Sequence, residues 1–140
     1  MQTITFPGRF ESLDRIREFV VQAARQAGFD EAATYAVELS VDEASTNIIE
    51  HAYDGEGNGD IDISVEITDQ DLIVILRDQG SPFDPSKVPV PNHNVPLEEL
   101  KPRGVGLFLI RKMMDEVQFE FTPDKGNILT MKKHRPGTGQ

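Results

Sequence analysis

Two neighbouring apolar segments in the middle of the chain restrict the folds that it can adopt. Residues 61–67 (IDISVEI) alternate between apolar and polar side chains, which is the period of a half-buried β-strand. Residues 72–76 (LIVIL) are apolar throughout, which predicts a central strand that is covered on both sides or near its end. Because residues 68–71 (TDQD) have the composition of a turn, the two segments predict a β-hairpin inside a larger sheet.

Helical spacing of apolar residues predicts two helices before this hairpin and one after it. The first follows Ser12, a predicted N-cap, and ends before Gly28, which suits the C′ position. The second begins after the predicted N-cap Asp30 and runs to about Ala52. The third follows residues 104–106 (GVG). The residues of the second helix that are predicted to face the core are Ala33, Val37, Val41, Ala44 and Ile48.

The complete order of predicted elements is β-α-α-β-β-loop-α-β-β. A short strand at residues 3–6 opens the chain, and a second hairpin joins residues 117–121 to residues 128–131. Hairpins separated by helices predict one α+β domain over residues 1–140. This domain would be a two-layer α/β sandwich, in which a mixed, mostly antiparallel sheet carries its helices on one face. Residues 134–140 are predicted to fray.

Composition excludes several classes of protein. The chain contains no cysteine, which excludes disulfides and cysteine-based zinc sites. No apolar run approaches the ~20 residues of a membrane-spanning helix, and the N-terminal residues lack the pattern of a signal peptide, so we expect a soluble, cytoplasmic protein. The net charge of −10 argues against non-specific nucleic-acid binding. A phosphate ligand would therefore need local donors, a helix N-terminus or a metal ion.

One edge of the second predicted helix carries three kinds of polar side chain. Glu43, Asn47 and His51 are spaced four residues apart, so an α-helix places them in a row that drifts by about 40° per step. Glu43 and Asn47 supply oxygen ligands of the type that Mg²⁺ prefers, and the carboxylate is also suited to accept a proton from a hydroxyl or a water. His51 is predicted to be a hydrogen-bonding group at the helix end. Such a row is more often a solvated helix edge, so its function depends on the rest of the chain.

Two glycine-containing segments lie on either side of a proline-rich stretch. Residues 78–84 (DQGSPFD) follow the most apolar strand, and an acid followed by a glycine allows the backbone to turn close to a ligand there. Residues 103–107 (RGVGL) open the third helix, where free N–H groups, the helix dipole and Arg103 would attract an anion. Each segment alone is also compatible with an ordinary turn. A loop as long as the stretch between them is usually functional or disordered.

Taken in order, these segments resemble the motifs of the GHKL ATP-binding superfamily, and most of all those of the bacterial anti-sigma-factor serine/threonine kinases of the RsbW/SpoIIAB type. The polar row matches the family pattern E-x-x-x-N-x-x-x-H-A-Y at residues 43–53. The first glycine segment matches D-x-G-x-P-F-D at residues 78–84, and the second matches G-x-G-L at residues 104–107. A late G-N-x-x-T segment at residues 126–130 completes the set. The resemblance covers residues 3–133 and implies the Bergerat ATP-binding fold.

The resemblance implies a role for each matching residue. Glu43 would be the general base that activates a serine or threonine hydroxyl, and Asn47 would coordinate a Mg²⁺ ion that bridges the phosphates of ATP or ADP. Asp78 would accept a hydrogen bond from the adenine amino group, Gly80 would let the backbone pass close to the base, and Thr130 would support the adenine end. Residues 81–102 would form the ATP lid. The implied phosphate-binding segment consists of Arg103, Gly104, Val105, Gly106 and Leu107.

The resemblance also implies a function. The chain would be an ATP-dependent serine/threonine-protein kinase that phosphorylates a STAS-type anti-anti-sigma protein and sequesters a sigma factor, and the family suggests a homodimer. Pro82 stands where the larger superfamily has a second glycine, which argues against gyrase-like and Hsp90-like activities. The alternative is an ATP- or ADP-binding regulatory switch of the same fold without kinase activity, and only Glu43 favours the kinase over this switch.

Overall fold

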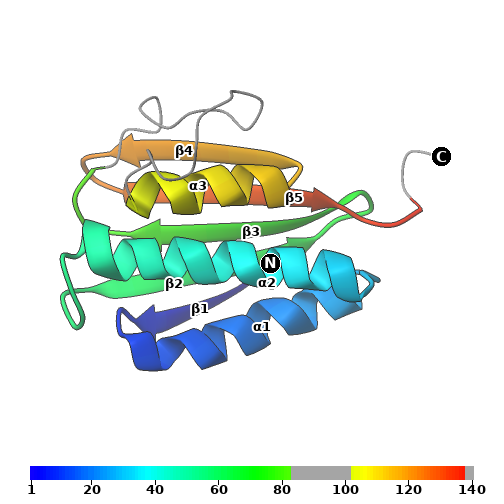
Figure 1. The fold of residues 1–140 in the computed structure, drawn as a ribbon, viewed down its shortest axis with the longest axis horizontal. Helices are drawn as coiled ribbons and strands as arrows, with labels where there is room; N and C mark the ends of the chain where they lie inside the picture. The colour runs from blue at the N-terminus through cyan, green and yellow to red at the C-terminus, as the bar shows by residue number, and fades with distance from the viewer. Residues whose placement is uncertain (83–101, 138–140) are drawn as a thin grey trace.

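The computed structural model describes residues 1–82 and 102–137. Five strands form one sheet in the order β1-β2-β3-β5-β4 (Figure 1). Each of the four pairings is antiparallel, so the described residues contain no parallel pair, although a mixed sheet was expected from the sequence. The strands are β1 (Gln2–Pro7), β2 (Asp60–Ile67), β3 (Asp71–Asp78), β4 (Glu116–Thr122) and β5 (Gly126–His134).

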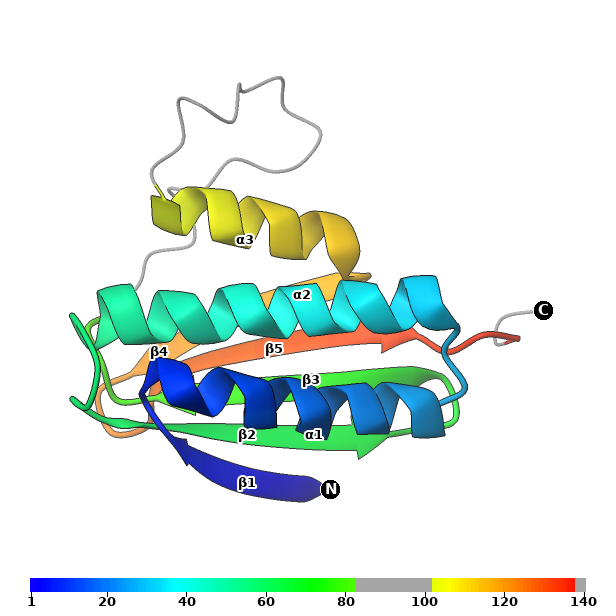
Figure 2. The same cartoon turned by 60° about the horizontal axis from the view of Figure 1, so that its bottom comes forward.

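Three helices of the described residues cover one face of this sheet (Figure 2). They are α1 (Leu13–Gln26), α2 (Glu31–Asn47) and α3 (Pro102–Met113), and α2 packs between the other two. The predicted α+β sandwich with its helices on one face is therefore confirmed. In the described ranges, no helix is long and apolar enough to cross a membrane.

Strand β3 lies at the centre of the sheet, as its apolar sequence predicts. Leu72, Val74 and Leu76 point toward the helices and are buried. Ile73 and Ile75 point to the opposite face, where they are half-buried and where no described helix lies (Figure 2). The apolar segment is therefore fully covered on the helix side only.

Of the three capping residues that the sequence predicts for the first two helices, two take the predicted role in the structure. Asp30 caps α2 because its side chain accepts a hydrogen bond from the Ala33 N–H at 2.8 Å. Gly28 follows α1 with φ of +89°, a conformation that favours glycine at the C′ position. Ser12 holds the N-cap position of α1, but its Oγ donates to the Pro7 carbonyl oxygen at 2.8 Å and caps no helical N–H.

The second helix changes geometry near its end. Its α-helical part ends at Asn47, and a single π turn, η2 (Ile48–Ala52), follows. In this turn the Tyr53 N–H donates to the Ile48 carbonyl oxygen at 2.9 Å. Helical backbone therefore reaches Ala52 as predicted, but its last turn is wider than an α-helix. Such π turns occur frequently at functional sites.

The C-terminal end of β5 is anchored rather than frayed. Arg135 donates from Nε to the Ala27 carbonyl oxygen at 3.0 Å and from a guanidinium nitrogen to the Thr68 carbonyl oxygen at 2.8 Å. The predicted fraying therefore does not begin at His134, and residues 138–140 lie outside the described residues. Of the predicted ATP lid, residues 83–101 also lie outside them.

Candidate functional site

Two members of the polar row on α2 lie against helix α3. Glu43 and Asn47 are one helical turn apart, and both side chains are half-buried. A Cβ atom placed on Gly106 would lie 2.4 Å from Asn47 Nδ2 and 3.2 Å from Glu43 Oε2. Both polar groups therefore rest directly on the backbone of α3, and only a glycine at position 106 leaves room for them.

The second glycine segment lies inside α3, whereas the sequence predicted that it would lead into the helix. Helix α3 begins at Pro102, a residue type that suits the first helical position, so Gly104 and Gly106 belong to its first two turns. Leu107 is buried on the same helix. The side chains of Arg103 and Val105 lie outside the described part of the chain, so their predicted roles remain predictions.

The surroundings of Glu43 raise the pKa of its carboxyl group above the ordinary value. Burial contributes most, because the protein interior disfavours the charged form, and the negative charges of Asp42 and Glu50 add to this effect. Asp42 in turn is paired with Arg17 of α1, at 2.6 Å between a guanidinium nitrogen and Asp42 Oδ1. These effects make the Glu43 carboxylate a stronger base than an exposed glutamate, which is compatible with the general-base role that the sequence predicts.

His51, the third member of the row, lies on the π turn η2. Its Nε2 atom is buried and makes no hydrogen bond to a described residue, and it lies 3.8 Å from Glu50 Oε2. The hydrogen-bonding role that was predicted for His51 is therefore not seen for this atom in the described ranges.

Asp78 ends β3 and anchors the turn that follows it. Its side chain is 4% exposed, and Oδ1 accepts hydrogen bonds from the Gly80 N–H and from Asn127 Nδ2, both at 2.9 Å. Asn127 Nδ2 also donates to the Ser81 carbonyl oxygen at 2.9 Å. On the other side of the turn, a Cβ atom on Gly80 would lie 2.4 Å from the Ala52 carbonyl oxygen. The turn is therefore fixed between the end of the second helix and strand β5.

Thr130 does not belong to this group. The β3–β5 register pairs Asn127 with Asp78 and Thr130 with Ile75. Paired residues share a face of the sheet, so Asn127 lies with Asp78 on the helix side and Thr130 lies on the open side. The sequence-based assignment of Thr130 to the adenine end is therefore corrected: Asn127, which had no assigned role, is the β5 residue beside Asp78.

A cavity between α2, α3 and strands β3 to β5 connects these groups. It brings together three predicted site residues, Asn47, Asp78 and Leu107, with the unassigned Asn127. Its apolar lining with one carboxylate and two amide groups offers the contacts that a heteroaromatic ring with an amino group would use, but the cavity measures only about 30 Å³, so its walls would have to move apart to admit such a ring. The remaining lining residues are apolar: Ala44, Ile48, Ile110, Phe119 and Leu129.

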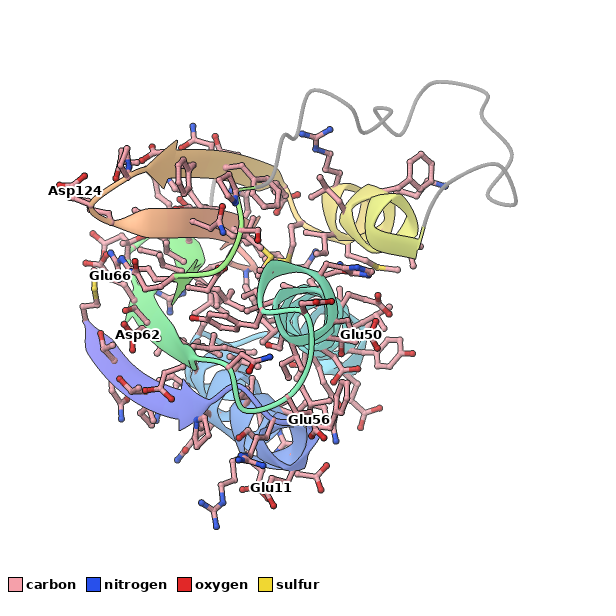
Figure 3. All side chains as sticks on the ribbon, turned by 90° about the vertical axis from the view of Figure 1, so that its left-hand side faces the viewer. Glu11, Glu50, Glu56, Asp62, Glu66 and Asp124 are labelled. Atoms are coloured by element: carbon pink, nitrogen blue, oxygen red, sulfur yellow. The ribbon has the colours of Figure 1, made fainter. Side chains whose placement is uncertain are left out.

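The end of the molecule that holds this site is acidic at its surface. Figure 3 looks onto the end where α2 and β3 terminate, and Glu50, Glu56 and Asp124 lie around it. These charges would repel an anionic ligand over a distance. A nucleotide bound here would therefore depend on local N–H groups and on a metal ion.

The oxygen donors of the site fit a Mg²⁺ ion that arrives with a nucleotide. Glu43 and Asn47 offer oxygens of the right kind, but the described residues contain no group of three or more Asp, Glu or His side chains that could hold a metal. Mg²⁺ usually takes few protein ligands and completes its shell with waters and substrate phosphates. A single amide or carboxylate ligand from α2 is therefore sufficient if phosphates supply the rest.

Replacing Gly80 with Ala is expected to destabilise the fold. The added methyl group would overlap the carbonyl group of Ala52, which is backbone and has little freedom to move. Overpacking of this kind costs about 1–3 kcal/mol, and urea unfolding followed by circular dichroism would measure it. Ser81→Ala is the matched control, because its side chain is exposed and its backbone bond to Ala52 is kept. Equal unfolding midpoints for the two variants would contradict the close packing.

Comparison with known proteins first identifies the class. The histidine kinase-like ATPase domain family matches residues 6–133, so the chain belongs to this family of ATP-binding domains. A nucleotide-free structure of the catalytic domain of histidine kinase ThkA has a TM-score of 0.57, covers 96% of this chain and 98% of its own, and is 17% identical in sequence. This likeness shows a shared fold.

Closer relatives within the family are serine-protein kinases. The chain is 34% identical over 135 residues to the serine-protein kinase RsbW of Halalkalibacterium halodurans, with 93% of this chain and 80% of the relative covered. It is 32% identical over 136 residues to RsbW of Listeria innocua, with 94% and 85% covered. The chain therefore falls in the RsbW-like group of kinases, and the family resemblance of its motifs is confirmed.

Proposed function

We propose that this protein is a serine/threonine-protein kinase that acts as an anti-sigma factor. It would transfer the γ-phosphoryl group of ATP to a STAS-type anti-anti-sigma protein and would sequester a sigma factor. One observation carries this proposal: Glu43 and Asn47 lie side by side against α3, and the cavity that Asn47 lines also contains the buried carboxylate of Asp78. The similarity to the RsbW kinases supports the same activity.

The adenine base would lie in the apolar cavity. Asp78 would accept a hydrogen bond from the amino group of adenine, and Asn127 would hold the Asp78 carboxylate in place through its 2.9 Å hydrogen bond. Gly80 would keep the backbone of the turn close to the base. Because the Asp78 side chain is buried, its hydrogen bond to the base would be little weakened by water.

The phosphates would lie between α2 and the first turns of α3. The family resemblance assigns Gly104, Val105 and Gly106 to phosphate binding with help from Arg103, and the dipole of α3, which begins at Pro102, would attract an anion to this end of the helix. Asn47 would hold Mg²⁺, which neutralises phosphate charge when it is bound. Leu107 would close the apolar wall beside the base.

Glu43 would act on the substrate hydroxyl. Its carboxylate would take the proton of a serine or threonine, the hydroxyl oxygen would form a bond to the γ-phosphorus, and the bond from that phosphorus to the β-phosphate oxygen would break and leave ADP. The raised pKa of Glu43 makes it a stronger base than an exposed glutamate. A homodimer remains a prediction from family resemblance.

Phosphoryl transfer to a partner tests the proposal. The protein would be incubated with Mg²⁺, γ-labelled ATP and candidate STAS proteins and sigma factors from the same organism. We expect label on a serine or threonine of the STAS protein and a stable complex with the sigma factor. ATP binding without label on any partner would favour the regulatory switch, and the absence of ATP binding would exclude both functions.

The pH dependence of kcat/KM should report the pKa of Glu43. The base works when deprotonated, so the rate falls as the pH falls through its pKa, and a raised pKa moves this loss to higher pH. Asp42→Asn removes a negative charge that raises the pKa of Glu43, so the acid limb should move to lower pH. Asp14→Asn is the control, because Asp14 also pairs with Arg17 but does not raise the pKa of Glu43. Equal shifts in both variants would contradict this assignment.

A further inference from the structure

The hydroxyl group of Tyr53 joins three separate segments of the chain. It donates a hydrogen bond to the Asp60 carbonyl oxygen at 2.6 Å and accepts one from the Gln79 N–H at 2.8 Å. Asp60 opens β2, and Gln79 directly follows Asp78. The side chain of Tyr53 is buried, and burial raises the pKa of its hydroxyl, which therefore remains protonated and able to donate.

The last residue of the π turn η2, Ala52, makes a second contact with the turn that follows β3. The Ala52 carbonyl oxygen accepts a hydrogen bond from the Ser81 N–H at 2.8 Å. Tyr53 and Ala52 thus bind the backbone N–H groups on both sides of Gly80, while Asn127 binds the Ser81 carbonyl oxygen from β5. Because the π turn ends at Ala52, its geometry decides where these two contacts lie.

We propose that Tyr53 is a positioning residue for base selection: its hydroxyl holds the turn at residues 78–81 so that the Asp78 carboxylate meets the amino group of the purine. This inference rests on the proposed function, since it needs a nucleotide in the cavity. Tyr53 itself does not line that cavity, so it would act only through the turn. Removal of its hydroxyl should therefore weaken the discrimination between purines without removing any group that touches the ligand.

The test compares ADP with inosine diphosphate, which has a carbonyl group where adenine has its amino group. Calorimetric titrations in Mg²⁺ would be made on the wild type and on Tyr53→Phe. The loss of a positioned hydrogen bond should lower ADP affinity by about two- to tenfold. The affinity for inosine diphosphate should change less, so the ratio of the two affinities should fall.

Tyr35→Phe is the matched control, because Tyr35 is the other tyrosine of the chain and is 60% exposed on α2. It should keep the wild-type ratio. If Tyr53→Phe kept the wild-type ratio of the two affinities, whether or not both affinities fell, the inference would be overturned and the proposed function would stand. A wild type that binds neither nucleotide would instead overturn the proposed function, and this inference with it.

Amide hydrogen exchange on the wild-type protein gives a readout that needs no variant. The side chain of Gln79 is exposed, yet its N–H is bonded to the Tyr53 hydroxyl, so this amide should exchange far more slowly than an unstructured one. The exchange rate of an unstructured peptide at Gln79 would show that the hydroxyl does not hold the turn.

Discussion

Glu43→Gln should reduce phosphoryl transfer to a partner protein by about 10²- to 10⁴-fold, which is the usual contribution of a positioned general base. The amide has nearly the shape of the carboxylate, so the contact with Gly106 should be kept. Because Glu43 does not line the cavity that would hold the base, ADP affinity should change little. Single-turnover transfer of label, together with a calorimetric titration of ADP, would measure the two effects separately.

Glu31→Gln is the control for this substitution. Glu31 lies in the first turn of the same helix and is exposed, so the variant makes the same chemical change away from the site. It should transfer phosphate at the wild-type rate. If Glu43→Gln also transferred at that rate, Glu43 would not be the base. The protein would then either rely on the nucleotide and metal alone or take its base from another residue.

Gly106→Ala should separate activity from stability. In a helix, alanine is more favourable than glycine by about 1 kcal/mol, and the group that the new methyl would strike is the flexible end of Asn47. The fold should therefore be unharmed or slightly stabilised. The new methyl group would lie 2.4 Å from Asn47 Nδ2, so the end of the Asn47 side chain would have to move away from it. The methyl group would also crowd Glu43 Oε2 at 3.2 Å. The proposed metal ligand and the proposed base would therefore both be displaced.

Loss of ligand orientation usually lowers metal affinity or activity by about 10- to 100-fold, and we expect a decrease of this size in phosphoryl transfer. Thermal unfolding would test the stability of the variant, and Mg²⁺-dependent ADP binding would test the metal site. Lys112→Ala is a suitable control, because Lys112 is exposed on the same helix. A variant with full activity would show that Gly106 does not support Asn47 and Glu43.

The sequence predicted the fold well where the side-chain period was clear. The alternating strand β2, the apolar strand β3 and the cap at Asp30 all appear in the structure as expected. Ser12 has the residue type of a cap, but its hydroxyl bonds to the Pro7 carbonyl oxygen, a contact that depends on how β1 approaches α1. The residue type of Ser12 therefore could not show that its hydroxyl bonds to Pro7 instead of capping the helix.

Three residues that the sequence singles out, Asn47, Asp78 and Leu107, line one cavity in the structure, whereas Thr130 lies on the other face of the sheet. Strand alternation alone would have corrected Thr130, because Leu129 and Met131 on either side of it are core residues. The same alternation places Asn127 on the core side, next to the end of β3. The period of the strand, and not the match to the family pattern, shows which of these two residues faces the cavity.

Two other features of the site could not be obtained from sequence patterns. The π turn η2 and the residue after it contact the turn after β3, which lies far along the chain, and no local residue pattern marks this change of helix geometry. The start of α3 at Pro102 places Gly106 against Asn47, and this close approach is a matter of helix packing rather than of local preference. Both features involve tertiary contacts.

The most direct test of the central claim is to locate bound ADP by nuclear magnetic resonance. On titration with ADP and Mg²⁺, the backbone signals of Gly80 and Gly106 and the side-chain amide signals of Asn47 and Asn127 should shift together, because all four surround one site. The amide of Thr130 on the open face should shift little. The absence of shifts at millimolar ADP, or shifts confined to the open face of the sheet, would contradict the nucleotide site described above.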